Sequence, residues 1–372
     1  MKTLSFAFSD CFIALKSGWS SRKMLIAFRG LLTAWLFYFI FTYIALMIDG
    51  QLAGGGIAAL FRNYEFFPFL FVCDANTQSL LFWFTGIAIA IVKLETTAVT
   101  VSRIAFQDLR GHDVYQSSEA KDYTKTLRKS FLIALFFPAF LAVIMLIPAG
   151  IAGFAGRIPL LGPVLIALLA LPLMFWAFII ACLLLVFIIG FWQLPAIAAV
   201  AGDDTLEMII ESFSVSLKRP LTHSIFQLIS RIVVLTGLIA LITSALAVFT
   251  IFVLILGNTM GSTFSEIITI ALYRIPGALS NICSWQTIAW AGYYLKVPLI
   301  VDTAASSMHM LVSGWILGIS MLLGITALLS YLFSVCFSSQ VIIYLSMKYR
   351  LSGEDVRLRS DIDYFTPEQI SK

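Results

Sequence analysis

Six uninterrupted apolar runs constrain the fold of this chain more than any other feature of its sequence. A helix needs about 20 apolar residues to cross about 30 Å of hydrocarbon. The runs that reach this length are Leu25–Ile48, Leu80–Ser102, Ser130–Ile151, Val164–Trp192, Ile225–Leu256 and Leu311–Leu345. A backbone in lipid must satisfy its own hydrogen bonds, and these runs lack the alternating pattern of a membrane β-strand. We therefore expect six transmembrane helices.

The composition excludes the other broad classes of protein. Of the 372 residues, 60% are hydrophobic and only 12% are charged, and the mean hydropathy is +0.97. A soluble domain has about 25% charged residues, so this chain has too few charges to cover a water-facing surface. A soluble enzyme, a disordered chain and a disulfide-rich secreted module are excluded. The expected fold is an all-α polytopic membrane protein, with one six-span domain over residues 1–350 and a short tail over 351–372.

The distribution of basic residues predicts which side of the membrane each loop occupies. With the N-terminus inside, sixteen of the 24 basic residues lie in the inner segments and the tail, and four lie in the outer loops. The outer four are Arg62, Arg157, Arg274 and Lys296. Since Lys and Arg accumulate on the cytoplasmic side, we predict that both termini are cytoplasmic. The net charge of +4 favours anionic lipid headgroups over nucleic acid as a partner.

A dibasic pair precedes each helix that runs outward. The three pairs are Arg22-Lys23, Arg128-Lys129 and Lys218-Arg219. Each ends a short amphipathic segment, which predicts a repeated unit of an interfacial helix, an outward span and an inward span. The three units cover residues 1–105, 113–192 and 203–345. The pairs are expected to anchor the helices at the inner interface. Convergence is the alternative explanation of the likeness, because basic residues flank most inner helix ends.

Four ionisable residues lie at membrane depth, where charge is costly and usually functional. They are Arg29, Lys93, Glu95 and Arg231, all in the predicted inner half of the bilayer. Lys93 and Glu95 are two residues apart and cannot face each other on one helix. We hypothesise that Glu95 pairs with Arg231 or Arg29 across a helix interface. Two interpretations stay open: a buried pair or snorkelling lysine that serves packing, and a path for a substrate or proton.

The two largest outer loops, over residues 49–79 and 257–310, are the expected surfaces for other membrane subunits. Each contains one cysteine, Cys73 in the first and Cys283 in the second. An oxidising exterior would permit a disulfide between these two residues.

No sequence motif indicates a metal, a cofactor or a catalytic centre. The three histidines, His112, His223 and His309, are far apart in the predicted topology. The sequence contains no His-Glu-x-x-His motif, no Gly-Lys pair of a phosphate-binding loop and no Gly-x-Ser-x-Gly elbow. We therefore expect no cofactor and no metal. In the sixth span, small residues such as Gly314 and Gly318 have the spacing of closely packed helices.

Two stretches carry a family resemblance. They run from Ser102-Arg103-Ile104-Ala105 to Lys129-Ser130-Phe131, and from Leu194-Pro195-Ala196-Ile197 to Lys218-Arg219-Pro220. The second combines an inward span, a proline, a short turn with Asp, an amphipathic helix and a basic pair. Residues 100–230 thus resemble uncharacterised bacterial polytopic membrane proteins and are similar to the membrane domain found beside some glycerophosphodiester phosphodiesterases. The resemblance implies a bacterial inner membrane. It does not carry over the phosphodiesterase activity, because no hydrophilic segment is long enough for the catalytic barrel.

These observations lead to two functional hypotheses. The first is a non-enzymatic membrane protein that acts as an accessory or assembly subunit, or in envelope or lipid homeostasis. The second is a small-molecule or lipid transporter-like protein whose site is the inner-half cluster of Arg29, Lys93, Glu95 and Arg231. A water-accessible cavity that reaches Glu95 from the inner side would distinguish the second hypothesis from the first.

Overall fold

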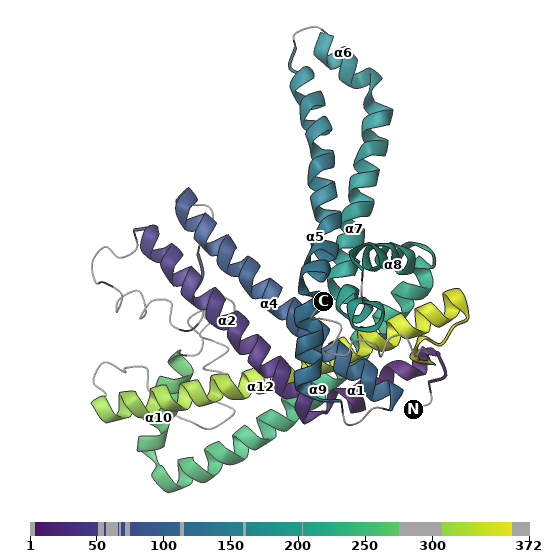
Figure 1. The fold of residues 1–372 in the computed structure, drawn as a ribbon. Coiled ribbons are helices and arrows are strands. Elements are labelled where there is room, and N and C mark those ends of the chain that lie inside the picture. The colour runs from purple at the N-terminus through teal and green to yellow at the C-terminus, as the bar shows by residue number, and fades with distance from the viewer. Residues whose placement is uncertain are drawn as a thin grey trace. The chain divides into compact units, whose positions relative to one another are not determined.

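The computed structural model is all-helical (Figure 1). It describes residues 4–50, 56, 66, 68–70, 75–111, 115–158, 161–202, 204–274 and 307–358. Cys73, Cys283, most of the two outer loops and the tail after Leu358 lie outside the described residues. Within the described ranges there is no β-strand.

Six helices are long and apolar enough to span a membrane, as the sequence predicts. They are α2 (Ser21–Ile48), α4 (Thr77–Arg110), α5 (Ser117–Ala155), α7 (Ala170–Ala201), α9 (Pro220–Met260) and α12 (Met308–Ser352). Each carries at most two charged residues in its most apolar 18-residue window. The fold class of an all-α, multi-pass membrane protein follows from these helices.

Shorter helices flank the long ones. They are η1 (Phe8–Phe12), α1 (Ile13–Gly18), α6 (Leu161–Leu168), α8 (Thr205–Leu217), α10 (Ser262–Arg274) and η2 (Val356–Leu358). At the start of α8, the Asp204 side chain accepts a hydrogen bond from the Leu206 backbone N–H over 3.3 Å. This N-cap is where the sequence predicts the third interfacial helix to begin.

The second repeat unit differs from the prediction of a separate interfacial helix. Residues 117–129 form the first turns of α5 itself, which continues to Ala155. In the third unit the chain breaks between α8 and α9, where Pro220 begins the new helix. A proline suits the first position of a helix but disfavours helical backbone in the residue before it. No proline stands after Arg128-Lys129, so the helix continues.

The helix ends also differ from the predicted spans. α4 continues from Ser102 to Arg110, and α7 continues through Pro195 to Ala201. These extensions are buried in protein, so they need no apolar run of lipid-facing length. At its other end α7 begins at Ala170, because a break at Leu169 separates it from α6. The predicted span Val164–Trp192 is therefore not one continuous helix.

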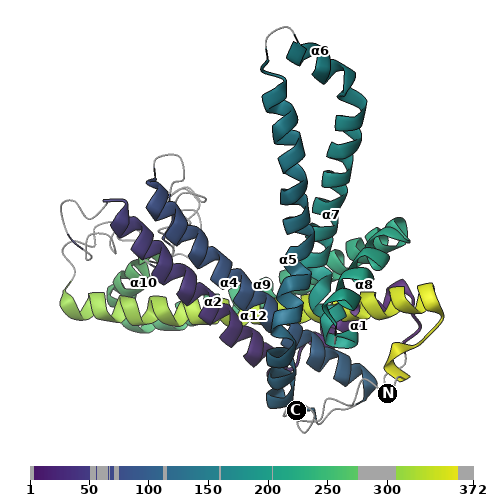
Figure 2. The ribbon, with the colours of Figure 1, turned by 45° about the horizontal axis from the view of Figure 1, so that its top comes forward.

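The chain divides into two compact bodies. The first body consists of Met1–Ile26, Glu95–Val234 and Phe333–Lys372, and the second consists of Ala27–Leu94 and Leu235–Leu332. In the first body, α5 and α7 lie side by side as a hairpin with α6 at its tip, drawn in teal (Figures 1 and 2). The Trp176 indole N–H of α7 donates a hydrogen bond to the Met145 carbonyl of α5 over 2.7 Å.

The second body contains two packed groups of helices. One buries Tyr43, Leu46 and Trp83 where α2 meets α4. The other packs α10 against α9 and α12. Gly314 lies so close to α10 that a Cβ atom would be 2.4 Å from Ile270 Cγ2, and at Gly318 it would contact Ala271. The predicted close packing at these two glycines is confirmed.

Candidate functional site: a buried polar layer in the first body

Three helices that are predicted to run inward, α4, α7 and α12, each end in a segment that is buried on all sides. Every residue is buried over 97–107, 193–200 and 337–347. Each segment precedes a glycine near the helix end, namely Gly111, Gly202 or Gly353. We call these three segments the central helix ends. They form the core of the first body.

The central helix ends carry an unusual number of polar side chains for a buried core. Those exposed by 7% or less are Thr97, Thr100, Ser102, Arg103, Gln107, Gln193, Ser338, Ser339, Gln340 and Ser346. A buried polar group costs free energy unless it is hydrogen-bonded. We call this set and its hydrogen-bond partners the polar layer. Its hydrogen bonds indicate whether these side chains join helices or are available for chemistry.

Several hydrogen bonds of the polar layer join one helix to another. Gln340 of α12 and Gln227 of α9 exchange two amide hydrogen bonds of 2.8 and 3.1 Å. The Ser230 and Ser339 hydroxyls are 2.7 Å apart between the same two helices. On the other side of the layer, the Thr100 and Thr124 hydroxyls are 2.9 Å apart between α4 and α5. These bonds hold neighbouring helices in one register.

Arg103 is the arginine of the polar layer, and it is named from the sequence only within the stretch that carries the family resemblance. Its side chain is 4% exposed and donates a hydrogen bond to the Ala199 carbonyl over 2.8 Å. Its guanidinium lies 4.1 Å from the centre of the Tyr123 ring. Apolar residues continue on α4 after Arg103, such as Ile104 and Phe106, and this signal could have shown that the helix remains buried.

The burial of Lys23 contradicts the expectation that this residue anchors the helix at the inner membrane interface. Its side chain is 0% exposed and its ammonium lies 3.0 Å from the Asp108 carboxylate of α4. It also donates a 2.8 Å hydrogen bond to the Ser17 hydroxyl of α1. Because a buried ammonium needs a close anion, Lys23 ties α1 and the start of α2 to α4 and does not reach lipid headgroups.

The other five residues of the dibasic pairs lie at the surface of the protein. The guanidinium of Arg22 donates to the Tyr115 carbonyl over 2.9 Å in an exposed position. The remaining exposed side chains are Arg128, Lys129, Lys218 and Arg219.

The four intramembrane ionisable residues do not form one cluster within either body. Arg29 and Lys93 belong to the second body and are exposed. Arg231 belongs to the first body, is also exposed, and lies 4.2 Å over the Trp192 ring. Glu95 is 3% exposed. Among the described residues Glu95 and Arg231 form no ion pair, although both lie close enough to the Cys336 thiol to act on it electrostatically.

The described residues include no group of three or more His, Cys, Asp or Glu side chains that could hold a metal ion. Cys11, Cys182 and Cys336 are free thiols. Burial and the adjacent Asp10 carboxylate raise the pKa of the Cys11 thiol to about 11, so this thiol is unreactive at neutral pH.

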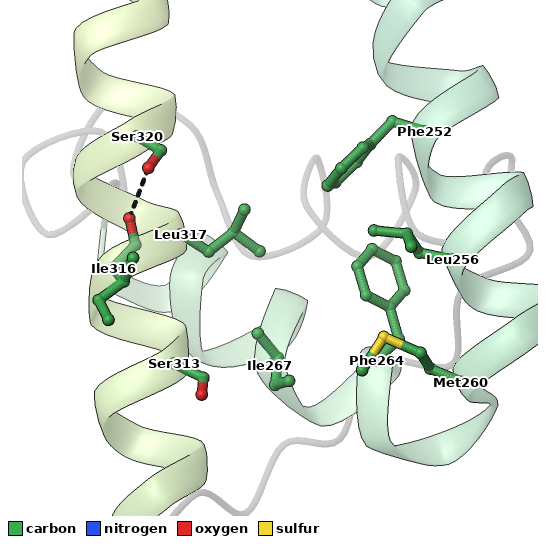
Figure 3. A pocket seen from close by; sticks show the side chains of 9 residues that line it. All are labelled: Phe252, Leu256, Met260, Phe264, Ile267, Ser313, Ile316, Leu317 and Ser320. Carbon is green, nitrogen blue, oxygen red and sulfur yellow. Dashed lines mark hydrogen bonds between the residues drawn. The ribbon is translucent and has the colours of Figure 1, made fainter.

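A separate pocket lies in the second body between α9, α10 and α12 (Figure 3). Its volume is about 300 Å³, and its wall is apolar apart from Ser313 and Ser320. The Ser320 hydroxyl donates to the Ile316 carbonyl of its own helix. The pocket therefore offers space for an apolar group and little polar chemistry.

Comparison with protein-family models, with curated proteins and with solved structures finds no match for this chain. The resemblance to the membrane domain beside glycerophosphodiester phosphodiesterases thus rests on the residues quoted above.

Proposed function

We propose that the chain is a multi-pass protein of a bacterial inner membrane with both termini in the cytoplasm. The excess of basic residues in the predicted inner segments supports this orientation. The exposed positions of Arg128, Lys129, Lys218 and Arg219 also fit contact with anionic headgroups. The family resemblance supports the choice of membrane.

The three repeat units would be related by equivalent polar contacts near the inner ends of their inward helices. In each unit, one residue that stands three to five positions before Gly111, Gly202 or Gly353 makes a polar contact. The contacts are Lys23 with Asp108, Tyr123 with the Ala198 carbonyl (2.8 Å) and Glu211 with Lys348. In each contact, the first residue lies in the predicted interfacial segment or at the start of the following helix. The second residue lies on the inward helix of the same unit. Ser102, Gln193 and Tyr344 stand nine residues before the same glycines, and each is at most 1% exposed.

Within the first body, the N-terminal segment would join the first of these units to the end of the third. The Ser334 hydroxyl of α12 donates a 3.0 Å hydrogen bond to the Gly18 carbonyl of α1. Near the other end of the segment, the Phe6 and Tyr349 rings stack with their centroids 4.0 Å apart. Arg350 donates to the Phe6 carbonyl over 3.1 Å. The first and last parts of the chain are thus joined without a covalent bond.

The function that this geometry supports best is a non-enzymatic one: an accessory or assembly subunit, or a protein of envelope or lipid homeostasis. One observation carries the proposal. Several buried polar side chains that a catalytic or transport site could use are instead engaged in bonds between helices, as between Gln227 and Gln340 and between Ser230 and Ser339. A layer of this kind supports a scaffold that presents its loops and lipid-facing helices to partners.

The proposal is tested by purifying the tagged chain from native membranes in mild detergent. We expect a stoichiometric membrane-protein partner that is lost when the outer loop over residues 49–79 is replaced by a Gly/Ser linker. A folded, partner-free chain that turns over a substrate by itself would contradict the accessory role.

A second candidate, a transporter-like protein, is favoured by the deeply buried carboxylate of Glu95. Cys336 provides a natural probe for it, because this thiol lies within electrostatic reach of Glu95. In a variant whose other four cysteines are replaced by alanine, a water path from the inside would let an impermeant maleimide label Cys336 in inside-out vesicles. Absence of labelling, with full labelling after unfolding, would favour the scaffold.

A further inference from the structure

Glu95 is a buried acid on α4 that lies outside the network of helix-joining hydrogen bonds described above. It lies on α4 just before the segment 97–107, about 12 Å along the helix from Arg103 at 1.5 Å per residue. Its side chain is 3% exposed. Within the part of the chain that the structure describes, its Oε2 atom has no hydrogen-bond partner.

Among the residues that the structure describes, no cation forms an ion pair with the Glu95 carboxylate. On its own helix, Lys93 is exposed and two residues away, a spacing at which side chains do not face each other. On α9, the Arg231 guanidinium is exposed and lies over the Trp192 ring. On α12, the Cys336 thiol lies within electrostatic reach of Glu95 and carries no positive charge that could pair with the carboxylate. An ionised carboxylate without a partner is too costly to keep in such a place, so it must take up a cation or a proton.

Within the described ranges, Glu95 has too few neighbouring ligands for a metal cation, and this favours a proton. A hard metal cation takes several oxygen ligands, six to eight in the case of Ca²⁺. Glu95 offers one carboxylate, and no metal-binding group of three acidic, His or Cys side chains exists among the described residues. A proton requires no additional ligand and removes the charge altogether.

We propose that Glu95 is a proton-binding site of the first body, occupied at neutral pH and situated on α4 just before the buried segment 97–107. If the chain is a transporter, as the second candidate function proposes, the proton at Glu95 would be its ion. Proton binding at Glu95 does not require transport, because a scaffold can also contain a protonated Glu95. Proton occupancy and transport are therefore measured separately.

The test uses an apolar carbodiimide on the full chain in proteoliposomes. A protonated carboxylic acid adds across one C=N bond of the reagent and gives its proton to a carbodiimide nitrogen, with no leaving group, so the peptide gains the mass of the whole reagent. We expect this adduct on Glu95 at pH 7. Asp108 is the matched control on the same helix, since it is paired with Lys23, and it should stay unmodified.

A second measurement keeps the proposal falsifiable if the reagent does not reach the site. Glu95→Gln is a neutral mimic of the protonated acid, so its apparent melting temperature in detergent should equal that of the parent chain. Asp108→Asn should melt well below it. Loss of stability in Glu95→Gln comparable with that of Asp108→Asn, or an adduct on Asp108 but not on Glu95, would overturn the proposal. Unchanged transport in Glu95→Gln would exclude Glu95 from the transport site and leave proton occupancy intact.

Discussion

Lys23 and Lys129 are the second residues of two dibasic pairs, and their surroundings are opposite. Lys23 is fully buried against Asp108, whereas Lys129 is exposed on α5. Removing one partner of a buried ion pair leaves an uncompensated charge, which costs about 3–5 kcal/mol. Lys23→Met should therefore lower the free energy of unfolding by this amount in detergent denaturation. Lys129→Met is the matched control and should change it little; equal effects would contradict the burial of Lys23.

The raised pKa of the Cys11 thiol predicts that the stability of the folded chain depends on pH through this one residue. Its pKa is raised from 9.0 to about 11 by burial and by Asp10, so the folded chain holds the thiol proton over a range where the unfolded chain releases it. The stabilisation is complete below pH 9 and declines as the pH rises toward 11. Thermal melts of the parent chain should show this decline. Cys11→Ala should have a flatter profile, and parallel profiles would refute the assignment.

At the scale of elements, close approach of α1 to α12 depends on the absence of a side chain at Gly18. A Cβ atom there would lie 2.3 Å from Val335 Cγ2 and 2.9 Å from Val335 Cα, and the second of these is backbone. Overpacking of this kind costs about 1–3 kcal/mol. We expect Gly18→Ala to lower the melting temperature and to expose residues 4–18 to protease.

Gly150 on α5 is the control for this substitution. A Cβ atom at Gly150 would meet no atom within 4 Å. Because alanine is the better helix former, Gly150→Ala should leave stability unchanged or slightly raised. A Gly18→Ala variant as stable as Gly150→Ala would show that α1 does not pack on α12 as described.

Helix existence was predictable from the sequence, and helix boundaries were not. Long apolar runs identify the six spans because lipid imposes a minimum length. The same criterion misplaces the inner end of α7, where Pro195 and residues up to Ala201 stay helical inside protein. The break before Pro220 and the continuity of α5 depend on a single proline in one unit and its absence in the other.

The buried contacts of the candidate site were largely beyond sequence reasoning. Lys23 and Asp108 are 85 residues apart, and nothing in the dibasic pattern distinguishes Lys23 from Lys129. Glu95 was identified because an acid in an apolar run is conspicuous at any depth. Its predicted pairing with Arg231 depended on side-chain direction, which spacing on two separate helices cannot supply.

For the whole molecule, the proposed orientation predicts the side from which each loop is reached. Arg157 lies near the tip of the α5–α7 hairpin, and Lys218 lies between α8 and α9. In a cysteine-free background, Arg157→Cys should react with an impermeant maleimide added outside intact spheroplasts. Lys218→Cys should react only in inside-out vesicles. The reverse pattern would invert the topology and refute the cytoplasmic termini.

The noncovalent link between the two ends of the chain within the first body is the central claim at this scale, and the contact between Phe6 and Tyr349 tests it most directly. The Phe6 and Tyr349 rings are stacked with centroids 4.0 Å apart, although 343 residues separate them in the chain. Phe6→Cys and Tyr349→Cys should be combined in a cysteine-free chain and oxidised in the membrane. The account predicts a cross-link within one chain, converting the product to a faster-migrating circular form. A product that remains uncross-linked, or that links only two chains, would contradict this link.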